Sequence, residues 1–443
     1  MRQCQLPENN AKKDPLFYSE LILSWLELKK EVFCFLKKCP LLHPIVLWGL
    51  AVGIREDPVE VADVLITHRN GDIRNIPVCV AKQECCLGKP FFLNQLGIGF
   101  PRLSLDLPGK PGGIIVQLLR QFCKVETNED YMPFLHNFKN MKNTYTGFVT
   151  APVLGGGTCN SEFEFLTNHS LSFFGRWVYP YQDHLKQKQD SMVNTLNSNG
   201  YNSIAVHAFK KESWNRENVY NYFGFSDFIT QEDFDSDTRR IRDFIADEEM
   251  FDKIIEIDEK EEGPLFIFGV TMQNHGGYEY GYKNDIKLLK NKNGKYNVAN
   301  EYFSLLKHSD DAFKKLIEYY ENVDEDTIIL MFGDHSPAFV YNNLIDDPNV
   351  DVNSLREHYD TPFYIWANYD IEGGYNENIS LNYLNLLLFE KANIELNSYQ
   401  KYLAELYNTY PNINIFMDVN NDENLKEYKN LQYYKIFDEY KKQ

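Results

Sequence analysis

The chain has 443 residues, 8 of them cysteine, and a formal net charge of −19. A charge balance this acidic excludes the usual nucleic-acid binders, which need basic surfaces to neutralise phosphates. It also argues against docking on anionic lipid by electrostatic attraction alone. The length is ample for one large domain with a sizeable core.

The amino-acid composition changes abruptly near residue 125. Residues 1–125 contain 7 of the 8 cysteines and 1 of the 29 tyrosines and have a net charge of +4, whereas the rest of the chain has −23. Such a change is typical of a domain boundary. We therefore expect an anomalous N-terminal segment without a clear domain (1–125), a main domain (126–410), and a charged C-terminal tail (411–443) that holds a surface helix.

In the main domain, apolar runs of strand length alternate with segments of helical periodicity. This alternation predicts an α/β fold with a mostly parallel central sheet and helices on both faces. The expected strands are 145–150, 202–207, 264–271, 326–332 and 361–367. The expected helices are 159–167, 187–199, 236–255, 300–321, 380–391 and 397–409.

The first candidate site residue, Thr158, follows the three glycines Gly155 to Gly157. Glycine permits a tight turn and a close approach of the backbone to a ligand. Because helix N-termini attract phosphate-like groups, a hydroxyl at the start of the next helix is a candidate nucleophile. Taken alone, the stretch fits a glycine-rich turn before an ordinary capped helix equally well.

A second candidate follows the apolar run that ends at Phe332, where the sequence continues Gly333-Asp334-His335. A carboxylate beside an imidazole suits Mn²⁺ or Zn²⁺ and, less well, Mg²⁺. In isolation the pair also fits a turn aspartate followed by a surface histidine.

Two further strands lead to polar side chains. The strand at 202–207 ends in His207, with Trp214 and Arg216 shortly after it, and the strand at 264–271 leads to His275. Arginine binds phosphate oxygens in a bidentate manner, and tryptophan offers a flat wall for a glycerol or a sugar. Ligand crevices in open α/β sheets lie at the carboxyl ends of strands, so we expect these strand ends to converge.

Together and in this order, the motifs resemble those of the lipoteichoic acid synthase-like phosphoglycerol transferases, within the sulfatase and alkaline-phosphatase superfamily. The resemblance covers residues 126–410 and implies an alkaline-phosphatase/sulfatase-like fold. Its motifs are Asn128–Phe134, Gly155–Thr167, His207 with Trp214–Arg216, Asn274–His275, Gly333–His335 and Thr361–Asn368.

The resemblance also implies the residue roles. Thr158 would be the catalytic nucleophile and would contact the metal. Asp334 and His335 would be the other metal ligands, for Mn²⁺ first and Mg²⁺ or Zn²⁺ as alternatives. The phosphoglycerol pocket would be lined by His207, Trp214, Arg216 and His275.

The implied reaction moves glycerol phosphate from phosphatidylglycerol, through a threonine-linked intermediate, to a glycerol-phosphate or glycolipid acceptor in cell-envelope polymer synthesis. By resemblance the enzyme works at the outer face of a cell membrane. The longest apolar stretch, Pro40–Ile54, is shorter than the ~20 residues that a membrane span requires. No signal peptide is apparent, so the chain as written reads as soluble.

One departure from the family pattern concerns the metal site. Relatives have a further carboxylate ligand on a strand before the Asn128–Phe134 motif, and the apolar run Ile114–Leu119 is followed by no carboxylate before Glu126. We therefore expect residues 1–125 to reflect a frameshift, a gene fusion or an assembly error. The cysteines are interpreted as unpaired thiols, and Cys159 as a packing residue.

Two alternatives stay open for this chain: a phosphodiesterase or other hydrolase of the same superfamily, and a catalytically inactive remnant that lacks one metal-ligand carboxylate. Sulfate-ester hydrolysis is disfavoured on sequence grounds. A sulfatase of the usual type needs Cys or Ser in a Cys/Ser-x-Pro-x-Arg context, and the residues from Thr158 to Ser161 contain neither Pro nor Arg.

Overall fold

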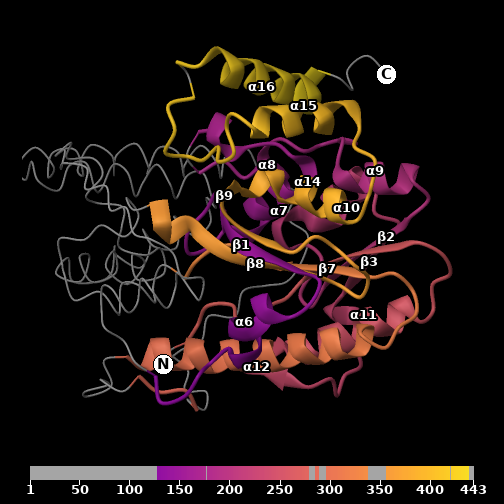
Figure 1. The fold of residues 1–443 in the computed structure, drawn as a ribbon, viewed down its shortest axis with the longest axis vertical. Coiled ribbons are helices and arrows are strands. Elements are labelled where there is room, and N and C mark those ends of the chain that lie inside the picture. The colour runs from indigo at the N-terminus through magenta and orange to yellow at the C-terminus, as the bar shows by residue number, and fades with distance from the viewer. Residues whose placement is uncertain are drawn as a thin grey trace, which may run out of the picture. The chain divides into compact units, whose positions relative to one another are not determined.

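The structure is a computed structural model that describes residues 127–175, 177–278, 285–288, 296–337, 356–419 and 421–438 (Figure 1). All of these residues belong to one unit of the chain, Gly97–Gln443. The expectations for residues 1–125, which include the candidate strand Ile114–Leu119 and the apolar stretch Pro40–Ile54, lie outside the described residues. Among the residues that are described, no helix combines the length and the apolar character needed to cross a bilayer.

Strands occupy nine segments of the described ranges. They are β1 (Thr144–Thr150), β2 (Asn202–His207), β3 (Asp227–Thr230), β4 (Arg240–Ile241), β5 (Phe244–Ile245), β6 (Leu265–Val270), β7 (Ile328–Phe332), β8 (Asp360–Ala367) and β9 (Gly374–Ser380). One sheet has the order β3-β2-β6 and is parallel throughout. A second has the order β7-β8-β1-β9, in which β8 is antiparallel to both neighbours and β1 is parallel to β9. β4 and β5 form a separate antiparallel hairpin.

The five expected strands are confirmed to within two residues at either end, but the expectation of a mostly parallel sheet needs correction. The four-stranded sheet is mixed because β8 runs against β1 and β7. Most of β8 is buried along its length, and a strand covered on both faces carries the same apolar run in either direction. The sequence pattern therefore reveals the strand and not its direction.

Helices cover both faces of the four-stranded sheet, as expected. They are α6 (Pro133–Asn137), α7 (Thr158–Thr167), α8 (Pro180–Asp183), α9 (Met192–Ser198), α10 (Arg216–Phe223), α11 (Asp247–Asp258), α12 (Asn297–Tyr320), α14 (Leu381–Lys391), α15 (Ser398–Tyr407) and α16 (Glu423–Tyr433). Figure 1 shows α6 and α12 on one side of this sheet and α7 and α14 on the other. Alternate side chains of β8 pack on opposite faces of the sheet. Phe363 and Ile365 pack with α7 and α14, whereas Trp366 packs with α6 and α12.

Short 3₁₀ helices connect these elements. Those in the described ranges are η3 (Phe138–Asn140), η4 (Leu171–Phe173), η5 (Ser213–Asn215), η6 (Gln231–Asp233) and η8 (Arg356–Tyr359), and a π-helical turn, η9 (Tyr434–Asp438), follows α16.

Two expected helices begin later than the sequence suggests. The segment 187–199 is helical only from Met192, because Ser191 caps α9 by accepting a hydrogen bond from the backbone N–H of Asn194. The segment 236–255 is helical only from Asp247, and the β4–β5 hairpin takes the preceding residues. Three acidic residues in the first turn of α11 favour a helix start there.

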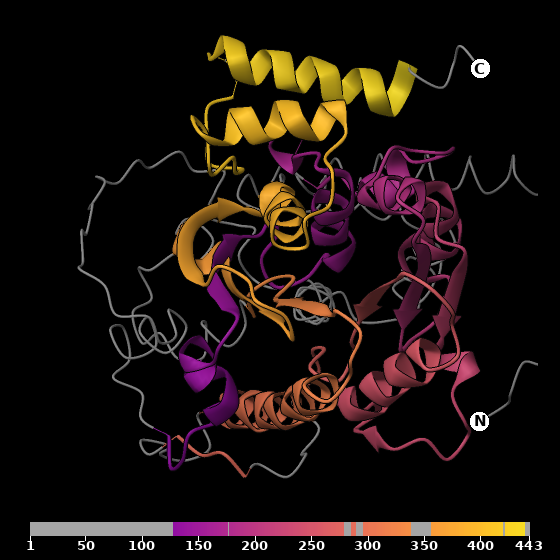
Figure 2. The same cartoon turned by 45° about the vertical axis from the view of Figure 1, so that its right-hand side comes forward.

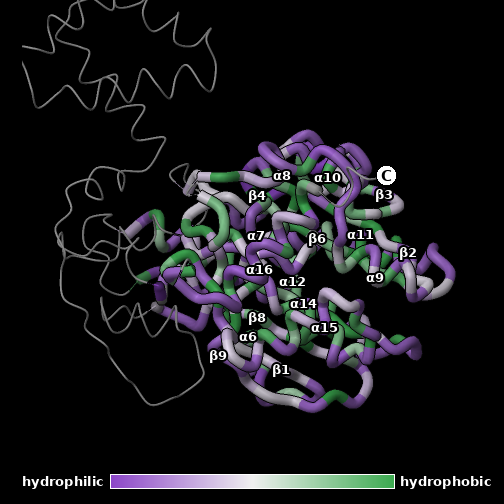
Figure 3. The backbone as a smooth tube through the Cα atoms, turned by 90° about the horizontal axis from the view of Figure 1, so that it is seen from above, coloured by the Kyte–Doolittle hydropathy of each residue, from purple (hydrophilic) through white to green (hydrophobic). Residues whose placement is uncertain are grey.

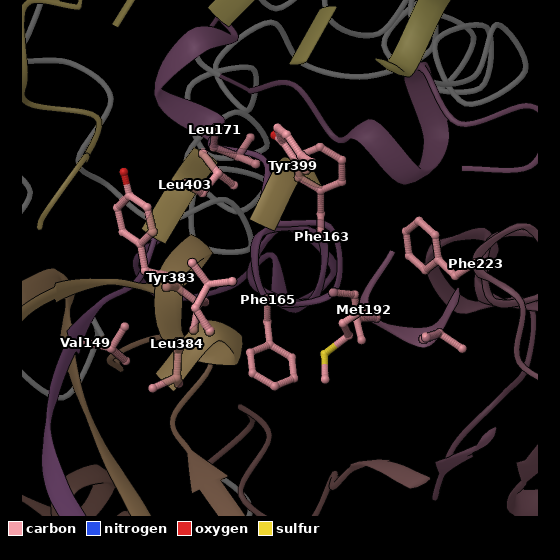
Figure 4. Close-up of a cluster of buried hydrophobic side chains, with 14 of the residues drawn as sticks. Val149, Phe163, Phe165, Leu171, Met192, Phe223, Tyr383, Leu384, Tyr399 and Leu403 are labelled. Atoms are coloured by element: carbon pink, nitrogen blue, oxygen red, sulfur yellow. The ribbon is translucent and has the colours of Figure 1, made fainter. Parts of the chain in front are cut away.

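Helix α7 lies in the middle of the main core. Every residue from Cys159 to Thr167 is buried, as expected of a helix covered on all sides. Figure 4 shows Phe163 pointing toward Tyr399 and Leu171, and Phe165 pointing to the opposite side of the helix. In Figure 3 the apolar segments lie mostly inside the outline of the chain and the hydrophilic segments mostly along it.

The C-terminal segment contains the expected surface helix, and one face of that helix packs against the core. Its helix is present as α16, and Figures 1 and 2 show α15 and α16 side by side, outside α14 and α7. Leu425, Tyr428 and Gln432 are buried. The Tyr428 hydroxyl donates to the carbonyl of Asn168, and the Gln432 side-chain amide pairs with both backbone groups of Ser170, at 2.7 and 3.1 Å. The tail therefore completes the core around the end of α7.

Candidate functional site

The glycine run before α7 forms a tight turn that brings Thr158 to the first position of the helix. Gly155 and Gly157 have φ values of 77° and 90°, which favour glycine over other residues. Gly157 caps the helix in the left-handed conformation. The Thr158 side chain thus stands at the positive end of a buried helix dipole.

Thr158 meets the Asp334-His335 pair directly. Its hydroxyl donates a hydrogen bond of 2.6 Å to Asp334 Oδ2, although 176 residues separate the two. Ser161, one turn further along α7, donates to the Asp334 carbonyl at 2.5 Å, and Gly155 N–H donates to the Ser336 carbonyl at 2.9 Å. The predicted convergence of the glycine run with the acid–imidazole pair is therefore present in the structure.

The residue before Asp334 shows why this loop has a fixed path. A Cβ at Gly333 would lie 3.0 Å from Thr361 Cβ on β8, closer than side chains usually pack. The Thr361 hydroxyl donates to the Gly333 carbonyl at 2.6 Å, and Gly333 N–H donates to the Pro362 carbonyl at 3.0 Å. β8 thus holds the backbone that presents Asp334.

His335 brings an imidazole nitrogen to the same point. Its Nε2 lies 3.2 Å from Asp334 Oδ2, so the hydroxyl, carboxylate and imidazole of Thr158, Asp334 and His335 share one small volume. His335 Nδ1 is buried without a hydrogen-bond partner among the described atoms. One hard oxygen, one imidazole and one hydroxyl fit a divalent cation. The described ranges contain no group of three or more His, Cys, Asp or Glu side chains placed to hold a metal.

Two other predicted residues, His207 and Arg216, meet in the interior. His207 Nδ1 donates to the Val270 carbonyl at 3.0 Å, because a carbonyl can only accept; its Nε2 therefore accepts from Arg216 Nη1 at 3.3 Å. Burial, followed by the Arg216 charge, lowers the pKa of His207 from 6.5 to about 4. His207 is therefore neutral at physiological pH, with both ring nitrogens in use.

Arg216 is held by a residue that the sequence analysis missed, Glu162. The guanidinium donates to the Glu162 carboxylate from Nε at 3.0 and 3.2 Å and from Nη2 at 2.5 Å, and both side chains are 3% exposed. Tyr220 OH donates to the same carboxylate at 2.9 Å. The role of Arg216 in binding phosphate stays a prediction, because its guanidinium is already bonded to Glu162, to His207 and to the Ser213 carbonyl in this state.

Glu162 lies four residues after Thr158 on α7, so the two side chains share one face of the helix. The sequence carries a signal for it, since Glu162 and Glu164 alternate with the phenylalanines Phe163 and Phe165. Buried carboxylates require partners. The partner itself, 54 positions away, does not follow from the sequence.

The Trp214 ring packs against Tyr179, which lies next to Gly157. The two rings lie 4.9 Å apart, and Tyr179 Cε1 would be 3.5 Å from a Cβ at Gly157, beside the nucleophile. Trp214 and Asn215 both have positive φ, 61° and 62°. Strained backbone of this kind persists where the surroundings impose it, and here the Asn215 side chain donates to the Tyr181 carbonyl at 3.0 Å.

His275, the last predicted pocket residue, lies in the loop that follows β6. Burial, with smaller contributions from the charges of His335 and Arg242, lowers the pKa of His275 below 6.5, while Asp334 opposes the shift. Its role in the pocket stays a prediction. Arg242 donates to the carbonyls of Gln273 and His275, a second contact that the sequence does not reveal.

Cys159 is buried among apolar residues of the core around α7, as expected of a packing residue. Burial raises the pKa of its thiol above the usual value, so the thiolate form is disfavoured. A hydroxyl nucleophile at residue 158 therefore has no competing thiolate beside it.

The arrangement is that of a buried helix whose N-terminal hydroxyl meets a carboxylate that is paired with an imidazole. Residues 123–385 match the Sulfatase family, and they make up more than half of the chain. The chain therefore belongs to the Sulfatase family, which confirms the resemblance found in the motifs.

Individual relatives agree with this assignment. A putative cyclic beta-1,2-glucan modification protein of Rhizobium meliloti is 30% identical over 329 residues, which cover 70% of this chain and 50% of that protein. A lipoteichoic acid synthase of Staphylococcus saprophyticus is 23% identical over 220 residues, or 48% of this chain and 33% of that enzyme. The chain thus spans half or less of the length of these relatives.

A solved structure shares the fold. The Streptococcus pyogenes phosphoglycerol transferase GacH, in complex with sn-glycerol-1-phosphate, superposes with a TM-score of 0.56 at 23% sequence identity. The match covers 70% of this chain and 81% of that one. The expected alkaline-phosphatase/sulfatase-like fold is therefore confirmed.

Proposed function

We propose that the chain is a metal-dependent phosphoglycerol transferase of cell-envelope polymer synthesis, acting at the outer face of a cell membrane. Its donor would be phosphatidylglycerol and its acceptor a glycerol-phosphate or glycolipid hydroxyl. The observation that carries the proposal is the 2.6 Å hydrogen bond from Thr158 to Asp334 at the N-terminus of α7. The glycerol 1-phosphate bound by GacH, which has a similar fold, supports the choice of substrate class.

A divalent cation held by Thr158, Asp334 and His335, with Mn²⁺ first and Mg²⁺ or Zn²⁺ as alternatives, would polarise a phosphoryl oxygen and lower the pKa of the hydroxyl. The remaining steps belong to the side chains. Thr158 Oγ1 forms a bond to phosphorus, and the bond from phosphorus to the diacylglycerol oxygen breaks, with the electron pair leaving on that oxygen. The hydroxyl proton already points at Asp334 Oδ2, so an acceptor for it is in place.

The proton taken up by Asp334 passes to the diacylglycerol oxygen. In the second half of the reaction, an acceptor hydroxyl oxygen forms a bond to phosphorus and the bond from phosphorus to Thr158 Oγ1 breaks. The proton of the acceptor hydroxyl passes through Asp334 to Thr158 Oγ1, which becomes a hydroxyl again. The dipole of α7 favours the negative charge on the phosphoryl group throughout. Trp214, with Tyr179 against it, would form a wall for the glycerol, and His275, His207 and Arg216 would complete the pocket. With its lowered pKa, His207 would serve as a neutral member of that pocket.

The test is turnover of fluorescent phosphatidylglycerol by the purified chain in Mn²⁺, comparing Thr158→Ala with Thr167→Ala. Thr167 ends the same helix, and its hydroxyl bonds only locally, to the Phe163 carbonyl at 2.6 Å and to the backbone N–H of His169 at 3.2 Å. We expect Thr158→Ala to abolish diacylglycerol release and Thr167→Ala to retain it. Mass spectrometry of the quenched reaction should find glycerol phosphate on the peptide that contains Thr158.

Three results would contradict the proposal. Turnover that survives Thr158→Ala would remove the nucleophile assignment. Glycerol phosphate that appears free in solution, and never on an added acceptor, would favour the hydrolase alternative. An unmodified chain that neither turns over nor gains thermal stability from Mn²⁺ would favour the inactive remnant.

A further inference from the structure

The β4–β5 hairpin carries an arginine in an unusual place. Arg242 is the first residue of its two-residue turn and has a φ of 56°, a conformation that hairpin turns usually assign to Gly, Asn or Asp. A long side chain with positive φ costs conformational energy and persists only where its surroundings fix it. The contacts of the Arg242 side chain show what fixes it.

The Arg242 guanidinium reaches into the loop after β6. Its Nη2 donates to the carbonyl oxygens of Gln273 and His275, both at 2.7 Å, and the side chain is 9% exposed. Arg242 Nη1 lies 3.8 Å from the carboxylate of Glu301, which is 2% exposed. A buried carboxylate thus offsets the charge of the cation that holds the loop.

Aromatic rings complete this contact. The Arg242 guanidinium lies 5.4 Å from the ring centre of Phe244 and 5.2 Å from that of Tyr278, which is cation–π range. The Phe244 ring is in turn 5.5 Å from the ring of His275. The hairpin therefore contacts both the backbone and the side chain of His275.

Other hydrogen bonds also hold this loop, since the Gln273 and Asn274 side chains donate to Ser309 Oγ and the Tyr278 hydroxyl donates to the Asn274 carbonyl. The sequence constrains the loop least after His275. It continues from His275 into Gly276 and Gly277, and Gly277 has a φ of 105°. Glycine pairs leave the backbone free to take many conformations. Fixing the carbonyls of Gln273 and His275 removes part of that freedom on both sides of residue 274.

We propose that Arg242 is a positioning residue that sets the orientation of His275 in the phosphoglycerol pocket. The inference rests on the proposed function, because it takes His275 to contact the substrate. Arg242 acts through the loop and does not touch the reacting atoms. Glu301 and the rings of Phe244 and Tyr278 keep its guanidinium aimed at the two carbonyls.

The test compares Arg242→Ala and Arg242→Lys with Arg239→Ala, in the full chain. Arg239 precedes the same hairpin and pairs with Glu248 and Glu249 at a half-exposed site, which makes it a matched control. Amide hydrogen exchange of residues 271–278 should rise in Arg242→Ala and stay unchanged in Arg239→Ala. Arg242→Lys, which can reach one carbonyl at a time, should fall between them.

Kinetics separate positioning from mere folding. With Mn²⁺ and phosphatidylglycerol, Arg242→Ala should lower kcat/KM by on the order of 100-fold, the loss that a misplacement of ~1 Å can cause, and most of this change should lie in KM. Exchange that is unchanged in Arg242→Ala, or that rises with no change in KM, would overturn the inference. Absence of turnover by the unmodified chain would overturn the proposed function instead, and the exchange comparison would still decide whether Arg242 holds the loop.

Discussion

Glu162 offers the sharpest test of how the site is built. Glu162→Gln keeps the shape of the side chain but leaves the Arg216 guanidinium without a counter-charge at a position where both side chains are 3% exposed. Breaking a buried ion pair by removing one partner costs about 3–5 kcal/mol. Tyr220 also loses part of its acceptor, so the upper half of that range is expected.

The measurement is the melting temperature in a thermal scan, taken with the free energy of unfolding in urea. At roughly 2 °C per kcal/mol for a large domain, Glu162→Gln should lower the melting temperature by about 8–10 °C. The control is Glu256→Gln, which breaks pairs with Lys253 and Lys260 at a half-exposed carboxylate. Pairs of that kind are worth about 0–1 kcal/mol.

A double variant separates the ion pair from the shape of the site. Replacing the arginine as well, in Glu162→Gln with Arg216→Met, removes the buried charge and should recover much of the lost stability, since buried pairs can often be exchanged for apolar contacts at little cost. If Glu162→Gln costs no more than Glu256→Gln, the two residues are not a buried pair and the account of Arg216 is wrong. If the double variant is no better than the single one, packing and not charge explains the loss.

Three further predictions concern the same core and site. Burial raises the pKa of Glu164 from 4.5 to about 8, so the folded chain keeps a proton that the unfolded chain releases. The free energy of unfolding should therefore fall as the pH rises from 6.5 to 8 in scanning calorimetry, and Glu164→Gln should flatten that dependence. An equal slope in both proteins would refute this prediction. Gly333→Ala should cost about 1–3 kcal/mol by crowding Thr361 and lower turnover, measured by urea unfolding and lipid cleavage; unchanged values would show that the loop can move away. Mn²⁺ at 100 times its Kd should stabilise the chain by about 2.7 kcal/mol, and chelation or Asp334→Asn, but not the exposed Asp370→Asn, should remove that gain in a thermal-shift assay.

The central strands could be predicted because their apolar runs are long and uninterrupted. The missed strands lack that signal: β3 has four residues, and β9 is exposed over most of its length and reads Gly-Tyr-Asn-Glu-Asn-Ile-Ser. β9 is an edge strand whose one neighbour, in the part of the chain that the structure describes, is β1. Such a strand can remain polar because water forms hydrogen bonds with the backbone groups on its unpaired edge. The start of the helix expected at 236–255 was wrong for a related reason. Strands of two residues, such as β4 and β5, are too short to show the alternation of apolar and polar residues that indicates a strand.

At the site, the sequence identified the residues that end strands or start helices, because backbone direction places those ends together. It predicted the meeting of Thr158 with Asp334, which the structure shows at 2.6 Å. It did not predict Glu162 or Arg242, whose importance depends on partners 54 and 33 positions away. Local patterns reveal which groups are available, and only the fold reveals which of them are already paired.

The docking of α16 has a consequence for anyone who shortens or recombines this chain. The match to the Sulfatase family covers residues 123–385 and ends inside α14. The Asn385 side chain donates to the Phe165 carbonyl at 2.5 Å, and Tyr428, beyond that range, donates to the Asn168 carbonyl. A truncation after residue 385 would remove α15 and α16 and so expose part of α7, the helix that presents Thr158. Chimaeras that exchange catalytic segments between relatives must therefore include α15 and α16, because the residues that cover α7 extend beyond the range that matches the family.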